Sequence, residues 1–384
     1  MTSTKTATPK HIMIIAGEAS GDQHAARLVR QLQRIAPFPI QFSGMGGKHM
    51  AEVGVTLISD LAHYGVTGFS GIFFHFRKIH RAFRDIQAQL RENPPDLLIL
   101  VDYPGFNLRL AKYAKHTLGL RILYYISPQI WAWKKNRIHT IKACVDHMAV
   151  ILPFEISYYQ AENIPVSFVG HPLLEDLPSP RPLSELRSTL GLPLDKKIVA
   201  FLPGSRTHEI QYHLPILLQS AQTLAEQDSN LHFVLPLAAT VERKLVKSYL
   251  KKYTLPFTLV SENALLVMQA SDAVVVASGT ASLECALLEK PMCIIYKGGF
   301  FSYMIANKVI RVPYFGLCNL LSHRMIVPEL LQYDVTAAHL CELIPKLLDP
   351  EQTITMRQDL YQLKQQLSSP SHSNLAELAL GLMH

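Results

Sequence analysis

The amino-acid sequence predicts an α/β fold of two Rossmann-like parallel-sheet domains facing a cleft, with helices at the C-terminal end. Short apolar runs rich in β-branched residues alternate with longer helical patterns over most of the chain, which is typical of βαβ units. Three prolines in LPSPRP interrupt the alternation, which then begins again. The 384 residues, 48% of them apolar, are enough for two domains with separate cores.

The first domain is predicted to span residues 1–177. Its apolar runs are expected to form buried strands: HIMIIAG, DLLILVD, RILYYIS and HMAVILP. The helical patterns between these strands cover residues 21–35, 76–92 and 107–117. Pro178, Pro180 and Pro182 disfavour both a helix and an internal strand, and therefore mark the domain boundary.

The second domain is predicted to span residues 178–345 and repeats the same rhythm. Its expected strands are KIVAFLPG, LHFVLPL, DAVVVAS and PMCIIYK. After about residue 335 the strand pattern stops, and three helical stretches close the chain. We expect the helices of residues 346–384 either to cross back to the first domain or to swap onto a partner chain, which would make a homodimer.

The charge of the chain is uneven. Residues 1–177 hold 19 of the 37 basic and 13 of the 30 acidic side chains, a net charge of +6, which leaves +1 for the remainder. An excess of this sign favours an acidic ligand or an anionic membrane as the partner of the first domain. Nucleic acid is not an expected partner, because the cations do not accompany a recognisable reader motif.

The five cysteines are scattered and form no CxxC pair, which favours a reducing compartment. The apolar stretch Ile12–Ala16 is too short for a signal peptide, and no run reaches the ~18 apolar residues of a membrane-spanning helix. We therefore expect a cytoplasmic protein that can still contact a membrane surface.

Ligands of parallel sheets bind beyond the carboxyl ends of the strands, so the loops there carry the candidate site residues. The loop after the first strand contains Glu18, Ser20 and Asp22 in GEASGD, a spacing that differs from a dinucleotide fingerprint. Its acidic side chains favour binding of hydroxyl groups, which makes these three the predicted acceptor-binding residues. The alternative is an ordinary turn in which Ser20 or Asp22 caps the helix.

Asp102 ends the apolar strand of LLILVDYPGFN and is the predicted catalytic residue. A carboxylate at this position is partly desolvated, which raises its pKa and suits it to accept a proton. The alternative is an N-cap, but Asp102 lies about five residues before the helix expected near Asn107.

Two loops of the second domain have the composition of an anion site. In LPGSRTHEI, Gly204 frees backbone amides, Ser205 offers a hydroxyl and Arg206 a planar fork that matches phosphate oxygens. In SGTASLE, residues Gly279, Thr280 and Ser282 open a helix whose N-terminus favours anions, and Glu284 can accept hydrogen bonds from ribose hydroxyls. The alternatives are a surface arginine in the first loop and a helix-dipole partner in the second.

The segment FSGIFFHFRKIHRAFR interleaves phenylalanines with cations, as an interfacial helix does. The predicted membrane-contact residues are Phe69, Phe73, Phe74, Phe76, Arg77, Lys78 and Arg81. The alternative is a crossover helix whose phenylalanines pack on the sheet. The sequence contains no DxD pair, so we expect no metal ion and no cofactor, with arginine and helix dipoles balancing the charge of the leaving group.

These motifs together resemble those of the lipid-A-disaccharide synthases, bacterial inverting glycosyltransferases with the two-domain GT-B architecture. The matching stretches keep their order over roughly residues 12–332: GEASGDQHAARL, FSGMGG, DYPGFN, SPQIWAWKKNR, VGHPLLED, LPGSRTHEI, ASGTASLECAL, CNLL and IVPELLQ. The long SPQIWAWKKNR match adds Gln129 and Trp131 to the predicted acceptor-binding residues. One departure is Gly105, where the family often has an acidic residue.

The resemblance implies transfer of 2,3-diacylglucosamine from its UDP conjugate to 2,3-diacylglucosamine 1-phosphate, with a β-1,6-linked disaccharide and UDP as products. It implies that Asp102 is the base and that Arg206, Glu284 and Asn319 belong to the UDP site. The alternatives are an epimerase acting on UDP-N-acetylglucosamine, which shares the GT-B architecture, and a nucleotide-binding protein without catalytic activity.

Overall fold

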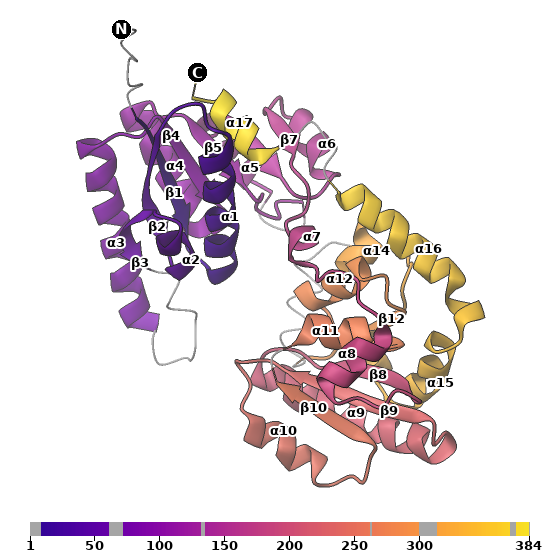
Figure 1. Ribbon diagram of the computed structural model, residues 1–384. Coiled ribbons are helices and arrows are strands. Elements are labelled where there is room, and N and C mark those ends of the chain that lie inside the picture. Colours follow the sequence, from indigo (N-terminus) through magenta and orange to yellow (C-terminus); the bar gives the residue numbers. More distant parts are fainter. Residues whose placement is uncertain are drawn as a thin grey trace, which may run out of the picture. The chain divides into compact units, whose positions relative to one another are not determined.

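The computed structural model describes residues 9–60, 72–131, 135–261, 263–298, 313–368 and 374–383, and only the backbone of residues 59, 60 and 72–77. The chain divides into two units (Figure 1). Unit 1 consists of Met1–Pro172 with Leu367–His384, and unit 2 of Leu173–Gln366. This division falls shortly before the predicted boundary at residues 177 and 178.

Unit 1 contains a parallel sheet in the order β3-β2-β1-β4-β5-β6-β7. The strands are β1 (Lys10–Ala16), β2 (Ile40–Gly46), β3 (Thr56–Asp60), β4 (Leu97–Val101), β5 (Ile122–Tyr125), β6 (His147–Val150) and β7 (Val166–Phe168). The chain first builds outward from β1 to β3 and then returns to add β4 on the other side of β1. The strand order therefore reverses between β1 and β4, the point at which α/β sheets bind ligands.

Helices cover both faces of this sheet. They are α1 (Ala19–Ile35), α2 (Lys48–Glu52), α3 (Ile72–Glu92), α4 (Pro104–Leu118), α5 (Arg137–Cys144), α6 (Glu155–Gln160) and α17 (Leu375–Gly381). Successive side chains of a strand point to opposite faces. Met13 and Ile15 accordingly pack in the core formed with α3, α4 and α5, whereas Ile12 and Ile14 pack with α1, α2 and α17. Helix α17, from the end of the chain, lies beside α1 (Figure 1).

Unit 2 repeats this topology with a parallel sheet in the order β10-β9-β8-β11-β12-β13. Its strands are β8 (Lys197–Leu202), β9 (Leu231–Leu237), β10 (Phe257–Ser261), β11 (Ala273–Ala277), β12 (Met292–Tyr296) and β13 (Glu329–Leu331). The order reverses between β8 and β11, so a second ligand position is expected there.

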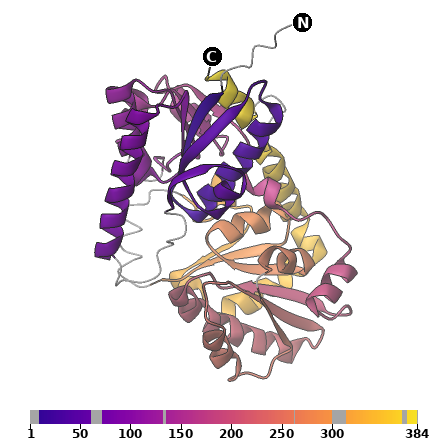
Figure 2. The ribbon, with the colours of Figure 1, turned by 60° about the vertical axis from the view of Figure 1, so that its left-hand side comes forward.

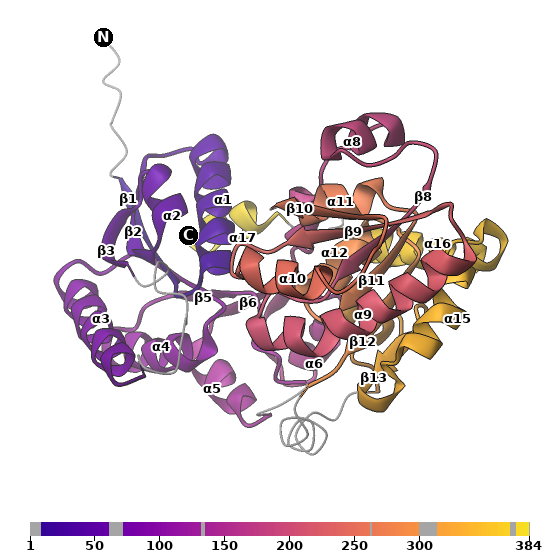
Figure 3. The same cartoon turned by 90° about the horizontal axis from the view of Figure 1, so that it is seen from below.

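The helices of unit 2 also form two layers. They are α7 (Leu173–Asp176), α8 (Leu183–Leu190), α9 (Thr207–Gln227), α10 (Arg243–Leu250), α11 (Ala264–Ala270), α12 (Thr280–Leu287), α14 (Leu317–Leu321), the 3₁₀ turn η2 (Gln332–Asp334), α15 (Ala337–Leu347) and α16 (Pro350–Leu367). Helices α9 and α15 lie on one face of the sheet, and α8, α11 and α12 on the other (Figure 3).

Every strand predicted from an apolar run is a strand of the structure, and the three closing helices are α15, α16 and α17. The sequence did not reveal β2, β3, β7, β10 and β13. These strands are short, like β7 and β13, or carry polar and glycine residues, like β2, so their hydrophobic pattern is weak. No helix in the described part of the chain is long and apolar enough to cross a membrane.

Candidate active site

Asp102 follows β4 at the place where the strand order of unit 1 reverses. Asp102 and Tyr103 both have left-handed backbone conformations, with φ of 45° and 46°. Such conformations are strained in residues other than glycine and persist only where the surroundings fix them. Here the amide of Asp102 donates to the carbonyl of Tyr125, and its own carbonyl accepts from Oη of Tyr124 and Nδ2 of Asn107, each at 2.7 Å. The backbone of Asp102 is thus fixed from β5 and α4 together.

The carboxyl of Asp102 is partly buried, and this burial raises its pKa to about 6. The negative charge of Glu18 contributes to this rise in pKa, while the amide of Tyr103 acts in the opposite direction. Helix α4 begins at Pro104, earlier than predicted, and its N-cap is Tyr103 without a side-chain hydrogen bond. Asp102 does not cap the helix. A carboxylate with a pKa near neutrality is well matched to general-base chemistry.

The GEASGD loop enters α1 at Glu18, the N-cap residue, which makes no side-chain capping bond. Neither Ser20 nor Asp22 caps this helix. Glu18 and Ser20 are exposed beyond the carboxyl end of β1, and because Ala16 pairs with Val101, the loop that carries them lies next to the loop of Asp102. Both residues remain candidates for contact with a ligand.

Asp22 requires a correction, because its carboxylate serves the fold. It is only 2% exposed and accepts hydrogen bonds from the amides of Gly47, His49 and Met50 and from Nδ1 of His49. These bonds satisfy the N-terminus of α2 and hold the FSGMGG loop against α1. With these four bonds the carboxylate is occupied, and Asp22 is not placed to bind an acceptor hydroxyl.

The loop after β5 carries Gln129, which is exposed, and Trp131, which is partly buried. Nε1 of Trp131 donates to Oε1 of Glu155 at 3.2 Å, so the polar group of the indole is already paired. Glu155 also accepts from the amide of Leu152. Burial raises the pKa of Glu155 to about 7, against the effect of the hydrogen bonds that it accepts. Glu155 was not among the predicted site residues; it is the first residue of the short helix α6 and stands among apolar and aromatic neighbours, such as Phe154 and Ile156.

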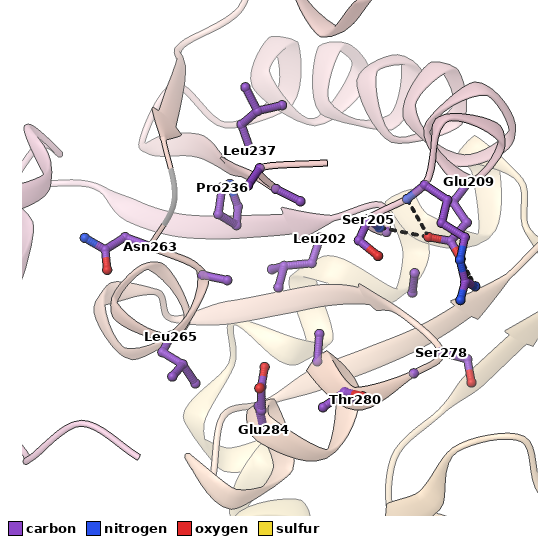
Figure 4. Close-up of a pocket in the computed structure, with 18 residues that line it drawn as sticks. Leu202, Ser205, Glu209, Pro236, Leu237, Asn263, Leu265, Ser278, Thr280 and Glu284 are labelled. Carbon is purple, nitrogen blue, oxygen red and sulfur yellow. Dashed lines mark hydrogen bonds and ion pairs between the residues drawn. The ribbon is translucent and has the colours of Figure 1, made fainter. Parts of the chain in front are cut away.

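Unit 2 has a pocket of about 760 Å³ where its strand order reverses (Figure 4). It is lined from the ends of β8, β9 and β11 and from the first turns of α11 and α12, and this size is typical of small-ligand sites. Pro236, Leu237 and Leu265 form apolar walls, and Asn263 stands at one side. None of these four was predicted; they follow only from the order of the strands.

Gly204, Ser205 and Arg206 line the pocket as predicted from LPGSR. Gly204 has a φ of 118°, and a Cβ there would lie 2.2 Å from Oε2 of Glu209. This close approach lets the Glu209 carboxylate accept from the amides of Ser205 and Arg206 at 2.8 and 3.1 Å, while Nη1 of Arg206 donates to Oε1 of Glu209 at 3.2 Å. The loop is therefore organised around an anion, and the Arg206 side chain is largely exposed.

Gly279, Thr280 and Glu284 line the other side of the pocket. Figure 4 shows the Glu284 carboxylate extending from α12 into the pocket. Burial, followed by the charge of Asp176, raises the pKa of Glu284. Ser282 needs a correction: it is 1% exposed, its Oγ donates to the carbonyl of Gly279 at 2.7 Å, and it does not line the pocket.

Asn319 also differs from the prediction, because it does not line this pocket and is fully buried in α14. Its Nδ2 donates to the carbonyl of Val327 and to Oε1 of Glu329, and its Oδ1 accepts from the amides of Ile326 and Val327. The side chain thus ties α14 to the segment that leads into β13. In the structure Asn319 supports the fold of unit 2.

Among the predicted membrane-contact residues, Phe69 lies outside the described residues. The side chains of Phe73, Phe74, Phe76 and Arg77 are likewise outside, although their backbone belongs to α3. Lys78 and Arg81 are exposed on this helix, and Nε of Arg81 lies 3.8 Å from Oδ2 of Asp85. Within the described parts of the chain, no group of three or more His, Cys, Asp and Glu side chains is arranged to hold a metal ion.

The motifs match a known family over nearly the whole chain. A family profile described as lipid-A-disaccharide synthetase matches residues 12–381. Lipid-A-disaccharide synthase 1 of Legionella pneumophila strain Paris is 53% identical over 359 residues, covering 93% of this chain and 93% of the relative. The chain belongs to the lipid-A-disaccharide synthase family. Membership makes it a hexosyltransferase of lipid A biosynthesis, which favours the synthase over the epimerase alternative.

Solved structures agree on the fold. The glycosyltransferase of kitacinnamycin superposes with a TM-score of 0.64 at 13% identity, covering 98% of both chains. A UDP-GlcNAc 2-epimerase from Neisseria meningitidis, bound to UDP-GlcNAc, superposes with a TM-score of 0.59 at 12% identity, covering 97% of this chain and 99% of the other. At such low identity the likeness shows the shared GT-B fold, and the family match carries the function.

Proposed function

We propose that the protein transfers 2,3-diacylglucosamine from UDP to the 6-hydroxyl of 2,3-diacylglucosamine 1-phosphate. Unit 1 would bind the lipid acceptor and unit 2 the nucleotide. The observation that carries the proposal is the placement of Asp102: a carboxyl with a pKa of about 6, at the strand-order reversal of unit 1, on a strained backbone fixed by three hydrogen bonds.

The Asp102 carboxylate would take the proton of the acceptor hydroxyl as that oxygen attacks the anomeric carbon of the donor. The bond from this carbon to the UDP oxygen breaks, and its electron pair leaves with the diphosphate. Attack opposite the leaving group inverts the anomeric centre, which gives the β-linkage. Glu18, beside Asp102, is suited to accept from another hydroxyl of the acceptor sugar.

The unit 2 pocket has groups for each part of UDP. Arg206 and the first turn of α12 are suited to the diphosphate, whose charge increases as the donor bond breaks. Glu284 would accept from the ribose hydroxyls, and Leu265 and Pro236 offer apolar contact to the base. The amides of Ser205 and Arg206 donate to the Glu209 carboxylate, and this arrangement supports the assignment of an anionic ligand to the loop.

The same proposal places the enzyme on the cytoplasmic face of the inner membrane, where a lipid acceptor is found. The net charge of +6 in residues 1–177 and the exposed Lys78 and Arg81 support attachment to anionic lipids. Such attachment is peripheral and weakens with salt, because each cation near the surface contributes only about 1 kcal/mol.

A mass-spectrometric assay tests the reaction. The protein is incubated with UDP-diacylglucosamine in detergent, with and without the diacylated sugar 1-phosphate, and both UDP and disaccharide are measured. We expect both products only when the acceptor is present, and Asp102→Asn to lower the rate roughly 10²- to 10⁴-fold. UDP release that does not depend on the acceptor would exclude the synthase reaction, and binding of UDP without turnover would favour a non-catalytic role.

A further inference from the structure

A second, smaller pocket lies in unit 1 between α3 and α4. The pocket has a volume of about 210 Å³. Helix α3, which forms one side of it, is the long purple helix of Figure 2. The walls of the pocket come from the apolar and aromatic side chains of Ile79, Phe83, Tyr103 and Phe106, together with His80, Gly105 and Arg109. The rings of Phe83 and Phe106 meet edge to face with centroids 5.2 Å apart, and Tyr103 stacks on Phe106 at 5.8 Å. The pocket thus shares Tyr103 with the loop of Asp102.

Gly105 forms part of the wall of this pocket. It lies in the first turn of α4, and a Cβ added there would meet no atom within 4 Å. The backbone is helical, so a larger residue would fit without strain. A side chain at this position would project into space that is now free, three residues after the catalytic carboxylate.

Arg109 supplies a positive charge at the same pocket. Its guanidinium carbon lies 5.3 Å from the ring centroid of Phe83. Among the residues that the structure describes, no carboxylate forms an ion pair with Arg109. Residue 105 lies four positions earlier, where an acidic side chain would pair with this arginine along the helix. Because Gly105 has no side chain, the cation is left for a ligand.

We propose that this pocket takes one acyl chain of the lipid acceptor, with Arg109 beside its 1-phosphate. The inference deepens the proposed function and rests on it. A largely apolar pocket beside the cation of Arg109 fits an amphiphile with an anionic head. The diacylated sugar 1-phosphate is such a molecule, because it carries both acyl chains and a phosphate. Along α4, at 1.5 Å per residue, the backbone of Arg109 lies about 7.5 Å from that of Pro104, two residues after Asp102, so the pocket lies on the same helix end as the catalytic loop.

Gly105→Leu tests the apolar part of the proposal. Leucine adds a large apolar side chain at the wall of the pocket and is a better helix residue than glycine, so the variant is expected to be at least as stable as the wild type. We expect KM for the diacylated sugar 1-phosphate to rise at least tenfold, while the Kd for UDP is unchanged. Gly381→Leu is the matched control, since Gly381 is also exposed in a helix of unit 1 with open space around it.

Arg109→Gln tests the charged part. We expect the preference for the phosphorylated acceptor over an analogue without the 1-phosphate to fall at least fivefold, with little change in the KM for the analogue. An acceptor KM within twofold of the wild-type value in Gly105→Leu would overturn the assignment.

A vesicle experiment separates the acceptor from bulk lipid. If Gly105→Leu loses binding to phosphatidylglycerol vesicles but keeps its acceptor KM in detergent, a membrane phospholipid occupies the pocket and the proposal is wrong. Wild-type disaccharide formation is measured in parallel. Its absence would overturn the proposed function itself, and is thereby distinguished from a failure of the pocket assignment.

Discussion

The ring of Tyr103 lies so close to Gly17 that a Cβ on Gly17 would be 2.2 Å from its Cδ1 atom. The contact joins the two loops at the strand-order reversal of unit 1. Ala16 pairs with Val101 in the sheet, so Gly17 and Asp102 directly follow the ends of two adjacent strands. Glycine at position 17 therefore allows Tyr103 to pack inward and leaves the Asp102 carboxyl at the edge of the sheet.

Gly17→Ala is expected to lower activity strongly. The added methyl group has to displace Tyr103, and with it the backbone of Asp102, and misplacement of a catalytic group by about 1 Å costs on the order of 10²-fold in rate. We expect a kcat decrease of this size with a moderate loss of thermal stability, measured by the disaccharide assay and by calorimetry.

Gly21→Ala is the matched control for this variant. Gly21 is also buried near β1, but its Cβ would lie 3.5 Å from Cβ of Ala16, an ordinary contact. We expect this variant to keep its activity. Equal kcat values for Gly17→Ala and the wild type would show that the Tyr103 contact does not position the base.

The pH dependence of the reaction should follow Asp102. A general base acts when deprotonated, so kcat/KM is expected to fall tenfold per unit as pH drops below about 6 and to level off above it. Glu18→Gln removes a negative charge that raises this pKa. The acid limb of kcat/KM should then move to lower pH in this variant, and an unmoved limb would assign it to another group.

The ionised Asp102 carboxyl should lower the free energy of unfolding at the pH at which it acts as a base. Its pKa is raised from 3.8 to about 6 in the folded state, so the folded protein binds the proton more tightly and stability declines as pH rises through this interval. Above pH 6 the cost is on the order of 3 kcal/mol. Asp102→Asn, which has no charge, should be more stable than the wild type at pH 8 and nearly equal at pH 4, measured by urea unfolding.

The sequence was sufficient to predict the α/β fold, most of the central strands and the loops that contain the candidate site residues. Continuous apolar strands such as LLILV are readily recognised in the sequence, and the loops at their carboxyl ends contain Asp102 in unit 1 and Gly204 in unit 2. The hydrogen-bond partners of the polar side chains were harder to predict from the sequence. Asp22 binds the backbone of Gly47, 25 residues later in the chain, and Asn319 binds the backbone of Ile326 across a turn, and only the fold reveals such partners.

Glu284 should make the enzyme selective for ribose. If its carboxylate accepts from the ribose hydroxyls, the wild type is expected to bind UDP about tenfold more tightly than 2′-deoxy-UDP, a difference of about 1.4 kcal/mol. Glu284→Ala should weaken UDP binding and remove most of this preference, as measured by calorimetric titration. A variant that keeps the full preference would place the ribose elsewhere. Glu226→Ala, on the exposed side of α9, provides a control of equal charge change.

Glu155 should control the environment of Trp131 in a pH-dependent manner. Its carboxylate is almost fully buried, has a pKa raised to about 7 and accepts from the indole Nε1. Trp131 and Trp133 are the two tryptophans of the chain, so Trp133→Phe leaves a single reporter. In this background the fluorescence of Trp131 is expected to titrate with a midpoint near pH 7, because loss of the negative charge weakens the bond from the indole.

Glu155→Gln, in the same background, removes the titrating group and should abolish the transition. Glu162→Gln is the control, since Glu162 is a partly exposed acid just after α6 that lies 3.7 Å from Lys142. The transition is expected to remain in this control. If Glu155→Gln also retains it, the indole reports on a different group. If the fluorescence changes while acceptor KM does not, Glu155 fixes Trp131 as part of the fold rather than for the acceptor.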